Sequence, residues 1–169
     1  RRCGLRRRTP CRARRRSVCR TSTPKHHRIT LTSPISLLLS GSDNDDGFAS
    51  GRAAVGTFLA EASFDNVFAS PLRHASAKPD VTDDFDDNEA SGWVTTEAPG
   101  TWAVTPDRAL TQSNATAIDA RATAPAVRGD QSTQARVKGT TFTNNGFVAV
   151  FARYQNFDNS YYLLLRNST

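Results

Sequence analysis

Two uninterrupted apolar runs near the C-terminal end constrain the fold more than any other feature of the sequence. Residues 146–154 and 161–166 consist mainly of aromatic, β-branched and other apolar side chains, and six turn-forming residues, 155–160, separate them. This pattern predicts a β-hairpin with a six-residue loop. Because both runs stay apolar on successive residues, both faces of each strand need cover, which is typical of strands in the middle of a sandwich. A lone hairpin is only marginally stable in water, so we expect further strands around it.

The rest of the chain consists of short alternating or apolar segments between turn formers, and no segment has the periodicity of an amphipathic helix. We therefore predict an all-β fold. The expected strands are residues 29–39 (interrupted at Ser33 and Pro34), 53–58, 62–70, a short segment around Phe85, a hairpin of 101–105 with 109–112, and 132–138. Residues 71–80 have the composition of a linker and divide the chain into two units, residues 29–70 and 81–169.

Charge is distributed unevenly along the 169 residues, whose formal net charge is +6. Residues 1–28 contain twelve basic and no acidic residues, whereas residues 29–169 contain ten basic and sixteen acidic residues. We predict that the Arg-rich residues 1–28 form a disordered tail, since they have too few apolar side chains for a core. The tail is a functionless extension, an arm for nucleic acid or another anionic surface, or an artefact of gene prediction. The acidic remainder is not expected to bind nucleic acid.

Cysteine and methionine usage give further limits. The sequence contains no methionine, so we interpret the chain as a fragment of a longer protein. Its three cysteines, Cys3, Cys11 and Cys19, lie in the tail at a spacing that matches no zinc motif, and we expect no disulfide in the folded part. The tail lacks the apolar segment of a signal peptide, and no run of eighteen apolar residues is present to span a membrane.

Several short motifs resemble a known family. Between residues 81 and 169, the segments that carry the resemblance are Asp-Asp-Phe-Asp-Asp at 83–87, Ser-Gly-Trp at 91–93, Gly-Thr-Trp at 100–102, Ala-Leu-Thr-Gln at 109–112, Ala-Arg-Val-Lys at 135–138, and 151–154 with 161–166. In this order they resemble the first half of a concanavalin A-like jelly-roll module, found in secreted bacterial polysaccharide-active proteins, some labelled pectate lyase. Residues 51–58 and 62–67 resemble the end of such a module.

The resemblance implies an incomplete jelly-roll β-sandwich, in which the closing strands of one module precede the opening and central strands of another. The chain is then either a window from a tandem array or a circular permutation. In this fold the first and last strands are neighbours, so both explanations imply that residues 62–70 lie beside residues 82–87.

The resemblance also implies a structural calcium ion near that seam. Its protein ligands would be Asp65, from the closing Phe-Asp motif, and Asp84 or Asp86, on either side of Phe85. Carboxylate oxygens suit calcium. The alternative is that these acidic residues belong to solvated loops.

For binding, the candidate residues are aromatic and basic side chains on or near the central strands. Aromatic rings stack on the apolar faces of sugars, and arginine matches the planar carboxylate of an acidic sugar. The candidates are Arg136, Arg153, Tyr154, Tyr162 and Arg166. The alternative is that the tyrosines pack at sheet margins and the arginines are solvated.

Three functions remain open. The leading one is a secreted carbohydrate-binding or ancillary module of a polysaccharide-degrading protein, monomeric or within a larger multidomain chain. The second is a pectate-type polysaccharide lyase, with Tyr154 or Tyr162 as the base and Arg153 beside it. The third is a structural or adhesive module without sugar specificity. The paired carboxylates of a glycosidase are missing, since Glu61, Glu89 and Glu97 all fall at predicted turns.

Overall fold

The computed structural model describes residues 34–41, 50–71, 81–95, 99–156 and 158–166. The predicted tail at 1–28, most of the linker at 71–80 and the start of the segment 29–39 lie outside these residues. The described part is all-β: its strands pair in one antiparallel sheet, and no helix is present in it, so none that could cross a membrane. The strands are β1 Ile35–Gly41, β2 Gly51–Pro71, β3 Val81–Asp83, β4 Trp102–Thr105, β5 Ala109–Gln112, β6 Ala120–Arg128, β7 Gln131–Asn156 and β8 Asn159–Arg166.

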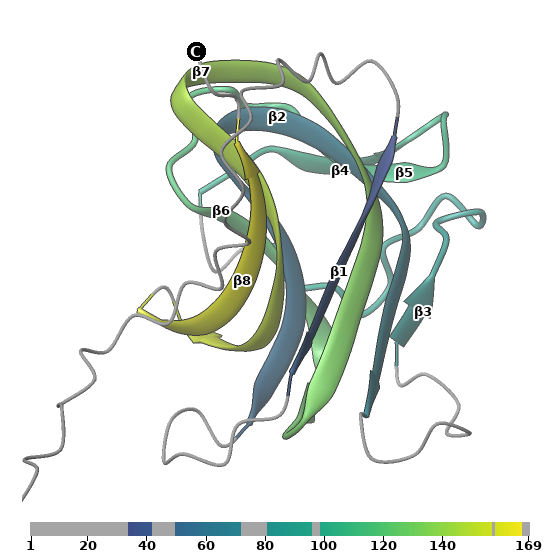
Figure 1. Ribbon diagram of the computed structural model, residues 1–169. Coiled ribbons are helices and arrows are strands. Elements are labelled where there is room, and N and C mark those ends of the chain that lie inside the picture. Colours follow the sequence, from purple (N-terminus) through teal and green to yellow (C-terminus); the bar gives the residue numbers. More distant parts are fainter. Residues whose placement is uncertain (1–33, 42–49, 72–80, 96–98, 157, 167–169) are drawn as a thin grey trace, which may run out of the picture.

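Two long strands, β2 and β7, run antiparallel to each other along most of their lengths and form the centre of the sheet. Both arch over together from one side of the molecule to the other (Figure 1). At the arch their register shifts between Phe58 and Ala60, and Leu59 has a positive φ of 48°. Opposite it, a side chain on Gly146 would collide with the carbonyl oxygen of Leu59, so only glycine permits this close approach.

This continuity corrects the predicted strand boundaries. Residues 53–58 and 62–70 were expected as two strands but form the single strand β2, and residues 132–138 and 146–154 are likewise parts of β7. The turn formers at the arch make β-bulges, which bend a strand without ending it. The hairpin of β7 with β8 is confirmed, although its loop is shorter than predicted, because Asn156 already pairs with Asn159.

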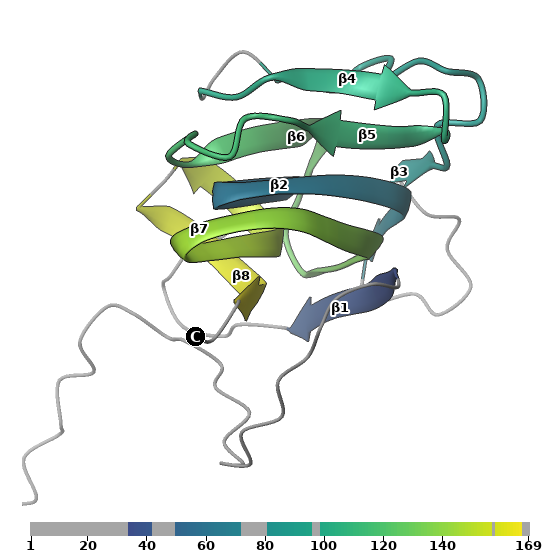
Figure 2. The same cartoon turned by 90° about the horizontal axis from the view of Figure 1, so that it is seen from above.

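The shorter strands flank this central pair on both sides (Figure 2). On the β7 side, β1 pairs with residues 131–137 and β8 with residues 147–156. On the β2 side, β6 pairs with residues 51–57, β5 with 62–64 and β3 with 67–69, and β4 pairs with β5. We call β1, β3, β4 and β5 with their parts of β2 and β7 half A, and β6 and β8 with theirs half B.

One hydrophobic core joins the two halves. Half A contributes Phe64 and Val137, half B contributes Val55 and Val148, and each of these side chains is at most 1% exposed. Because alternate residues of a strand face opposite sides, half B also has an outer face that points away from this core. The molecule thus has one shared interior and separate outer faces on its two halves.

The predicted seam between residues 62–70 and 82–87 is confirmed. β2 pairs with β3 through Val67 and Asp83, and Phe64 and Phe85 are both fully buried in the shared core. Phe85 was predicted to lie in a short strand, and this prediction is wrong. Phe85 lies in the turn after β3, where it has a positive φ of 53°. The predicted hairpin of residues 101–105 with 109–112 is confirmed as β4 and β5. The strand β6 was not predicted.

A buried glutamine fixes the arch of β2. The Gln112 side chain is 0% exposed, and its amide nitrogen lies 2.7 Å from the Thr57 hydroxyl oxygen and 2.8 Å from the Ala60 carbonyl oxygen, on either side of the bulge at Leu59. Its amide oxygen accepts the backbone N–H of Asn114. One side chain therefore satisfies polar groups that the bulge would otherwise leave buried without partners.

We predict that Gln112→Leu lowers the free energy of unfolding by about 2–4 kcal/mol, because it leaves buried acceptors at Thr57 and Ala60 without a donor. Urea-induced unfolding followed by circular dichroism measures this change. The neighbouring exposed residue provides the control, since Ser113→Ala should change stability by less than about 0.5 kcal/mol. Equal effects of the two substitutions would contradict the role of Gln112.

Candidate functional site

The structure divides the five predicted sugar-binding residues between the two halves. Arg136 lies on β7 in half A, with its side chain 51% exposed, and its Nη1 is 3.6 Å from the Asp65 carboxylate. Arg153, Tyr154, Tyr162 and Arg166 lie in half B on β7 and β8. The structure therefore does not bring Arg136 together with the other four.

Arg153 is a buried structural residue. It is 4% exposed and has a positive φ of 51°. Its Nε donates to the Gly129 carbonyl oxygen at 3.1 Å, its Nη2 pairs with the Asp130 carboxylate, and its guanidinium lies 5.7 Å from the centre of the Tyr161 ring. These contacts tie the turn between β6 and β7 to the distal part of β7. A guanidinium held in this way is not available to a ligand.

The outer face of half B carries an array of aromatic and basic side chains, which we call the aromatic face. Residues that pair across its four strands, and so share this face, come from alternate positions. They are Arg121 and Thr123 on β6; Ala54, Gly56 and Phe58 on β2; Phe147, Ala149 and Phe151 on β7; and Tyr162, Leu164 and Arg166 on β8. Tyr154 joins them by packing its ring edge-on against Phe151.

Exposure on the aromatic face increases from β6 toward β8. Tyr162 is 39% exposed and Arg166 is also exposed. Between them and the buried part, the half-buried rings of Phe58 and Phe147 stack in parallel with centroids 5.3 Å apart, and the Arg166 guanidinium lies 5.9 Å from the Phe147 centroid. The margin at β8 is therefore the part of this face that a ligand can reach.

At the buried end, Arg121 lies across the sheet with 4% exposure. A side chain at Gly56 would collide with the Arg121 side chain, so glycine makes room for it. The guanidinium stacks 4.4 Å from the centre of the Phe151 ring, a cation–π contact. Its Nη1 donates to the carbonyl oxygens of Thr57 (3.3 Å) and Ala120 (3.0 Å), and its Nη2 donates to the Asp119 carboxylate at 3.3 Å.

Burial perturbs both members of the Arg121 pair. Desolvation lowers the pKa of Arg121, with the Asp119 charge opposing it, and desolvation raises the pKa of Asp119, with Arg121 opposing it. The guanidinium remains charged at any physiological pH. The sequence analysis missed Arg121, although one signal was present: Arg121 and Thr123 alternate with Ala120, Ala122 and Ala124, which is a strand with one apolar face.

Of the two tyrosines proposed as a lyase base, only Tyr162 is accessible. Tyr154 is 8% exposed, and its predicted neighbour Arg153 is engaged with Asp130. A base must lie within hydrogen-bond reach of the proton that it removes. The combination of Tyr154 with Arg153 therefore does not present a base and a cation to a polymer in this structure.

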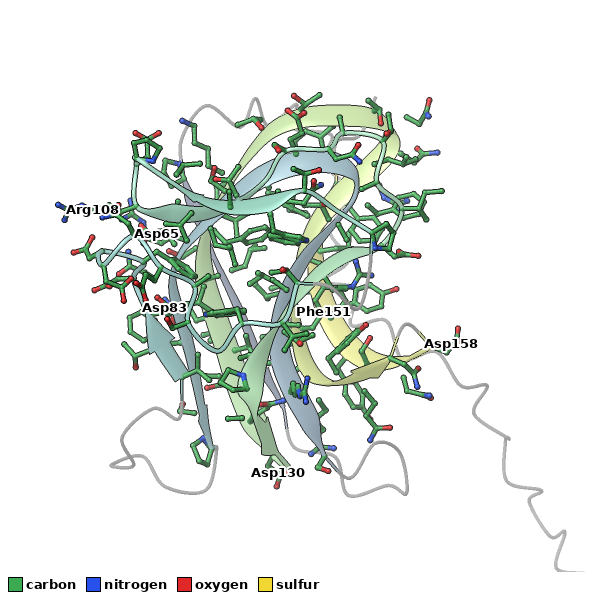
Figure 3. All side chains as sticks on the ribbon, turned by 180° about the vertical axis from the view of Figure 1, so that it is seen from behind. Asp65, Asp83, Arg108, Asp130, Phe151 and Asp158 are labelled. Carbon is green, nitrogen blue, oxygen red and sulfur yellow. The ribbon has the colours of Figure 1, made fainter. Side chains whose placement is uncertain are left out.

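Asp65 lies on the same side of the molecule as Asp83 and Arg108, away from Phe151 (Figure 3). The other two predicted calcium ligands belong to this side as well, since Asp84 follows Asp83 in the chain and Asp86 pairs with Arg108. The Asp65 carboxylate pairs with Arg136, and the Asp86 carboxylate lies 3.3 Å from Arg108. The Asp84 carboxylate accepts the backbone N–H of Asp86.

Within the described residues, no group of three or more acidic, histidine or cysteine side chains is placed to hold a metal ion. Asp65 and Asp86 would have to leave their arginine partners to bind calcium together. Calcium binding at Asp65, Asp84 and Asp86 therefore stays a prediction of the resemblance, and we assign it no part in the site.

Asp83 and Trp93 fix the turn after β3, which contains Phe85. Asp83 accepts the backbone N–H of Phe85 at 2.9 Å and the indole N–H of Trp93 at 2.6 Å. The rings of Phe85 and Trp93 pack 5.9 Å apart. This acidic residue has a structural role that the sequence did not single out.

We predict that Asp119→Asn changes how stability depends on pH. A carboxyl group with a higher pKa in the folded than in the unfolded state binds its proton more tightly when folded, so it lowers stability as the pH rises above the ordinary value of 3.8. The stability of the variant minus that of the wild type should therefore increase from acidic to neutral pH. Urea-induced unfolding at a series of pH values measures this difference. A difference that decreases over the same range would show that the ion pair with Arg121 outweighs desolvation.

We predict that two ion pairs of β7, Arg153 with Asp130 and Arg136 with Asp65, differ strongly in their contribution to stability. Arg153→Met should cost about 3 kcal/mol or more, because it removes the buried arginine partner of Asp130. Arg136→Met provides the matched control on the same strand, and its exposed pair with Asp65 should contribute less than about 1 kcal/mol. Chemical unfolding of both variants tests the comparison, and equal losses would contradict the structural role of Arg153.

Comparison with known proteins gives no assignment. No protein-family model matches the chain, and neither the curated proteins nor the solved structures give a significant match. The resemblance to concanavalin A-like modules thus rests on the short motifs quoted above. The structure adds the all-β antiparallel architecture, which that family shares with many others.

Proposed function

We propose that the chain is a carbohydrate-binding module and that the exposed margin of the aromatic face, at β8, is its binding surface. The observation that carries the proposal is the placement of Tyr162 and Arg166 on one face of one strand. They are four residues apart, so they lie about 13 Å from each other along β8. An exposed ring can stack on a sugar, and an exposed guanidinium at this distance can bond to a neighbouring unit of the same polymer.

Two features of the structure support binding over the alternative functions. The lyase hypothesis needs an accessible base beside a cation. Tyr154 and Arg153 are both buried, so the accessible Tyr162 does not have the predicted cation Arg153 available beside it. A purely structural module has no need for an exposed tyrosine at the margin of an aromatic cluster, where Tyr162 packs against Phe151. Secretion and attachment to a larger polysaccharide-degrading protein belong to the same proposal through the family resemblance.

We predict that Tyr162→Ala weakens binding to polysaccharide by about tenfold, because the exposed ring is lost while the fold is kept. The measurement is retention of the purified protein on immobilised pectin, xylan and alginate. Leu38→Ala is the control, since Leu38 is 56% exposed on β1 in half A and is not part of the aromatic face.

The outcomes separate the three functions. Retention that depends on Tyr162 and not on Leu38 supports the proposal. The ultraviolet absorbance of an unsaturated uronate, appearing on incubation with pectin or alginate, would show a lyase instead. If the wild-type protein is not retained on any of the three polymers and its melting temperature does not change when they are added, the function that remains is a structural or adhesive module.

A further inference from the structure

On the aromatic face, the guanidinium of Arg121 has one buried nitrogen without a hydrogen-bond acceptor. Its Nη1 and Nη2 have acceptors, but its Nε is buried and has no hydrogen-bond partner. A buried donor without an acceptor costs free energy, and native proteins rarely leave one. This nitrogen lies on a cation that is 4% exposed and stacks on the ring of Phe151, against which Tyr154 and Tyr162 pack.

The geometry of the guanidinium indicates what the missing acceptor is. Nε–H and one N–H of Nη2 point in parallel and together match the two oxygens of a single carboxylate. Asp119 fills only half of this fork, through one oxygen placed 3.3 Å from Nη2. Charge-assisted hydrogen bonds of this type are normally about 2.7–2.9 Å long. Asp119 is thus a poorly fitting partner, and its desolvation already raises its pKa.

We propose that Nε and Nη2 of Arg121 form a subsite for the carboxylate of an acidic sugar, and that Asp119 occupies part of this subsite when no ligand is bound. The inference rests on the proposed function and deepens it, because it makes a uronate the substrate class. The ligand approaches the fork from Tyr162, whose partly exposed ring lies 5.8 Å between centroids from Phe151, the ring on which the Arg121 guanidinium stacks. The sugar carboxylate then replaces Asp119 at Nη2 and supplies the acceptor that Nε lacks.

Arg121 and Asp119 have different roles in this subsite. Arg121 provides the positive charge and the planar fork, which lysine cannot reproduce because its ammonium is a point charge. Asp119 competes with the ligand for the same nitrogen. Removal of its charge should therefore strengthen the binding of an acidic ligand, which a merely structural role of the pair does not predict.

The test compares two forms of one polymer, polygalacturonate and fully methyl-esterified polygalacturonate, which differ in the methyl ester that removes the charge of each carboxyl group. Affinity electrophoresis measures the dissociation constant of the wild type, Asp119→Asn and Arg121→Lys for each form. We expect the wild type to prefer the charged form, Asp119→Asn to increase this preference about tenfold, and Arg121→Lys to abolish it. Circular dichroism melting of each variant checks that it is folded.

Each outcome decides the question. Binding of both forms with equal affinity, or a preference that Asp119→Asn leaves unchanged, overturns the subsite while the carbohydrate-binding function stands. Failure to bind either form, together with failure on xylan and alginate, overturns the proposed function itself. If Arg121→Lys does not fold, the increase expected for Asp119→Asn still decides between the outcomes.

Discussion

The antiparallel pairing of β2 with β7 is the interaction on which the rest of the structure depends. These two strands pair on both sides of the arch, so the same ribbon serves as the centre of half A and of half B. Every other strand except β4 pairs directly with one of the two. Because the ribbon bends, Val55 and Val148 from half B meet Phe64 and Val137 from half A in a single core. Without the bend, the sheet would have two apolar patches with nothing to cover them.

The sequence predicts most strands of this fold, but it misses β6 and does not predict the continuity of β2 and β7. The segments around Phe64 and Val148 are apolar enough to be recognised, and the turn residues at 106–108 mark the hairpin of β4 and β5. The ends of strands are harder, because a bulge and a loop have the same local chemistry. Asn144 has a positive φ of 51° and a sequence typical of turns, yet it lies inside β7, because Phe142 before it and Phe147 after it both pair with β2.

The same bulges explain why the site was only partly predicted. Strict alternation places residues an odd number apart on opposite faces of a strand. Phe151 and Tyr154 are three apart, yet their rings pack 5.9 Å from each other, because the irregularity after Ala152 includes Arg153 at a positive φ. Periodicity could therefore indicate that Tyr162 and Arg166 share a face on the regular strand β8. It could not indicate that Arg153 turns inward, or that Tyr154 joins Phe151.

Arg121 and Arg153 are both buried in half B, and each pairs with an acidic residue near one end of β6. These ion pairs matter because β6 itself contributes little apolar packing. This strand is rich in alanine and contains Pro125, so it buries little apolar area for its length. An acidic residue stands next to each of its ends: Asp119 pairs with Arg121 at the start, and Asp130 pairs with Arg153 of β7 just beyond the end.

Charges are costly to bury, and such pairs rarely add net stability over apolar residues of the same size. The pair at Asp130 does penalise misplacement, because a slip of β6 along β2 would move Asp130 away from Arg153 of β7 and leave this arginine buried without its carboxylate. The pair of Arg121 with Asp119 moves together with β6. We infer that the register of β6 is set by charge rather than by apolar packing. The chain can then tolerate an imperfect ion pair at Asp119, since the pair at Asp130 still holds the other end of the strand. This leaves Arg121 as the cation that can exchange its partner for a ligand while β6 remains in place.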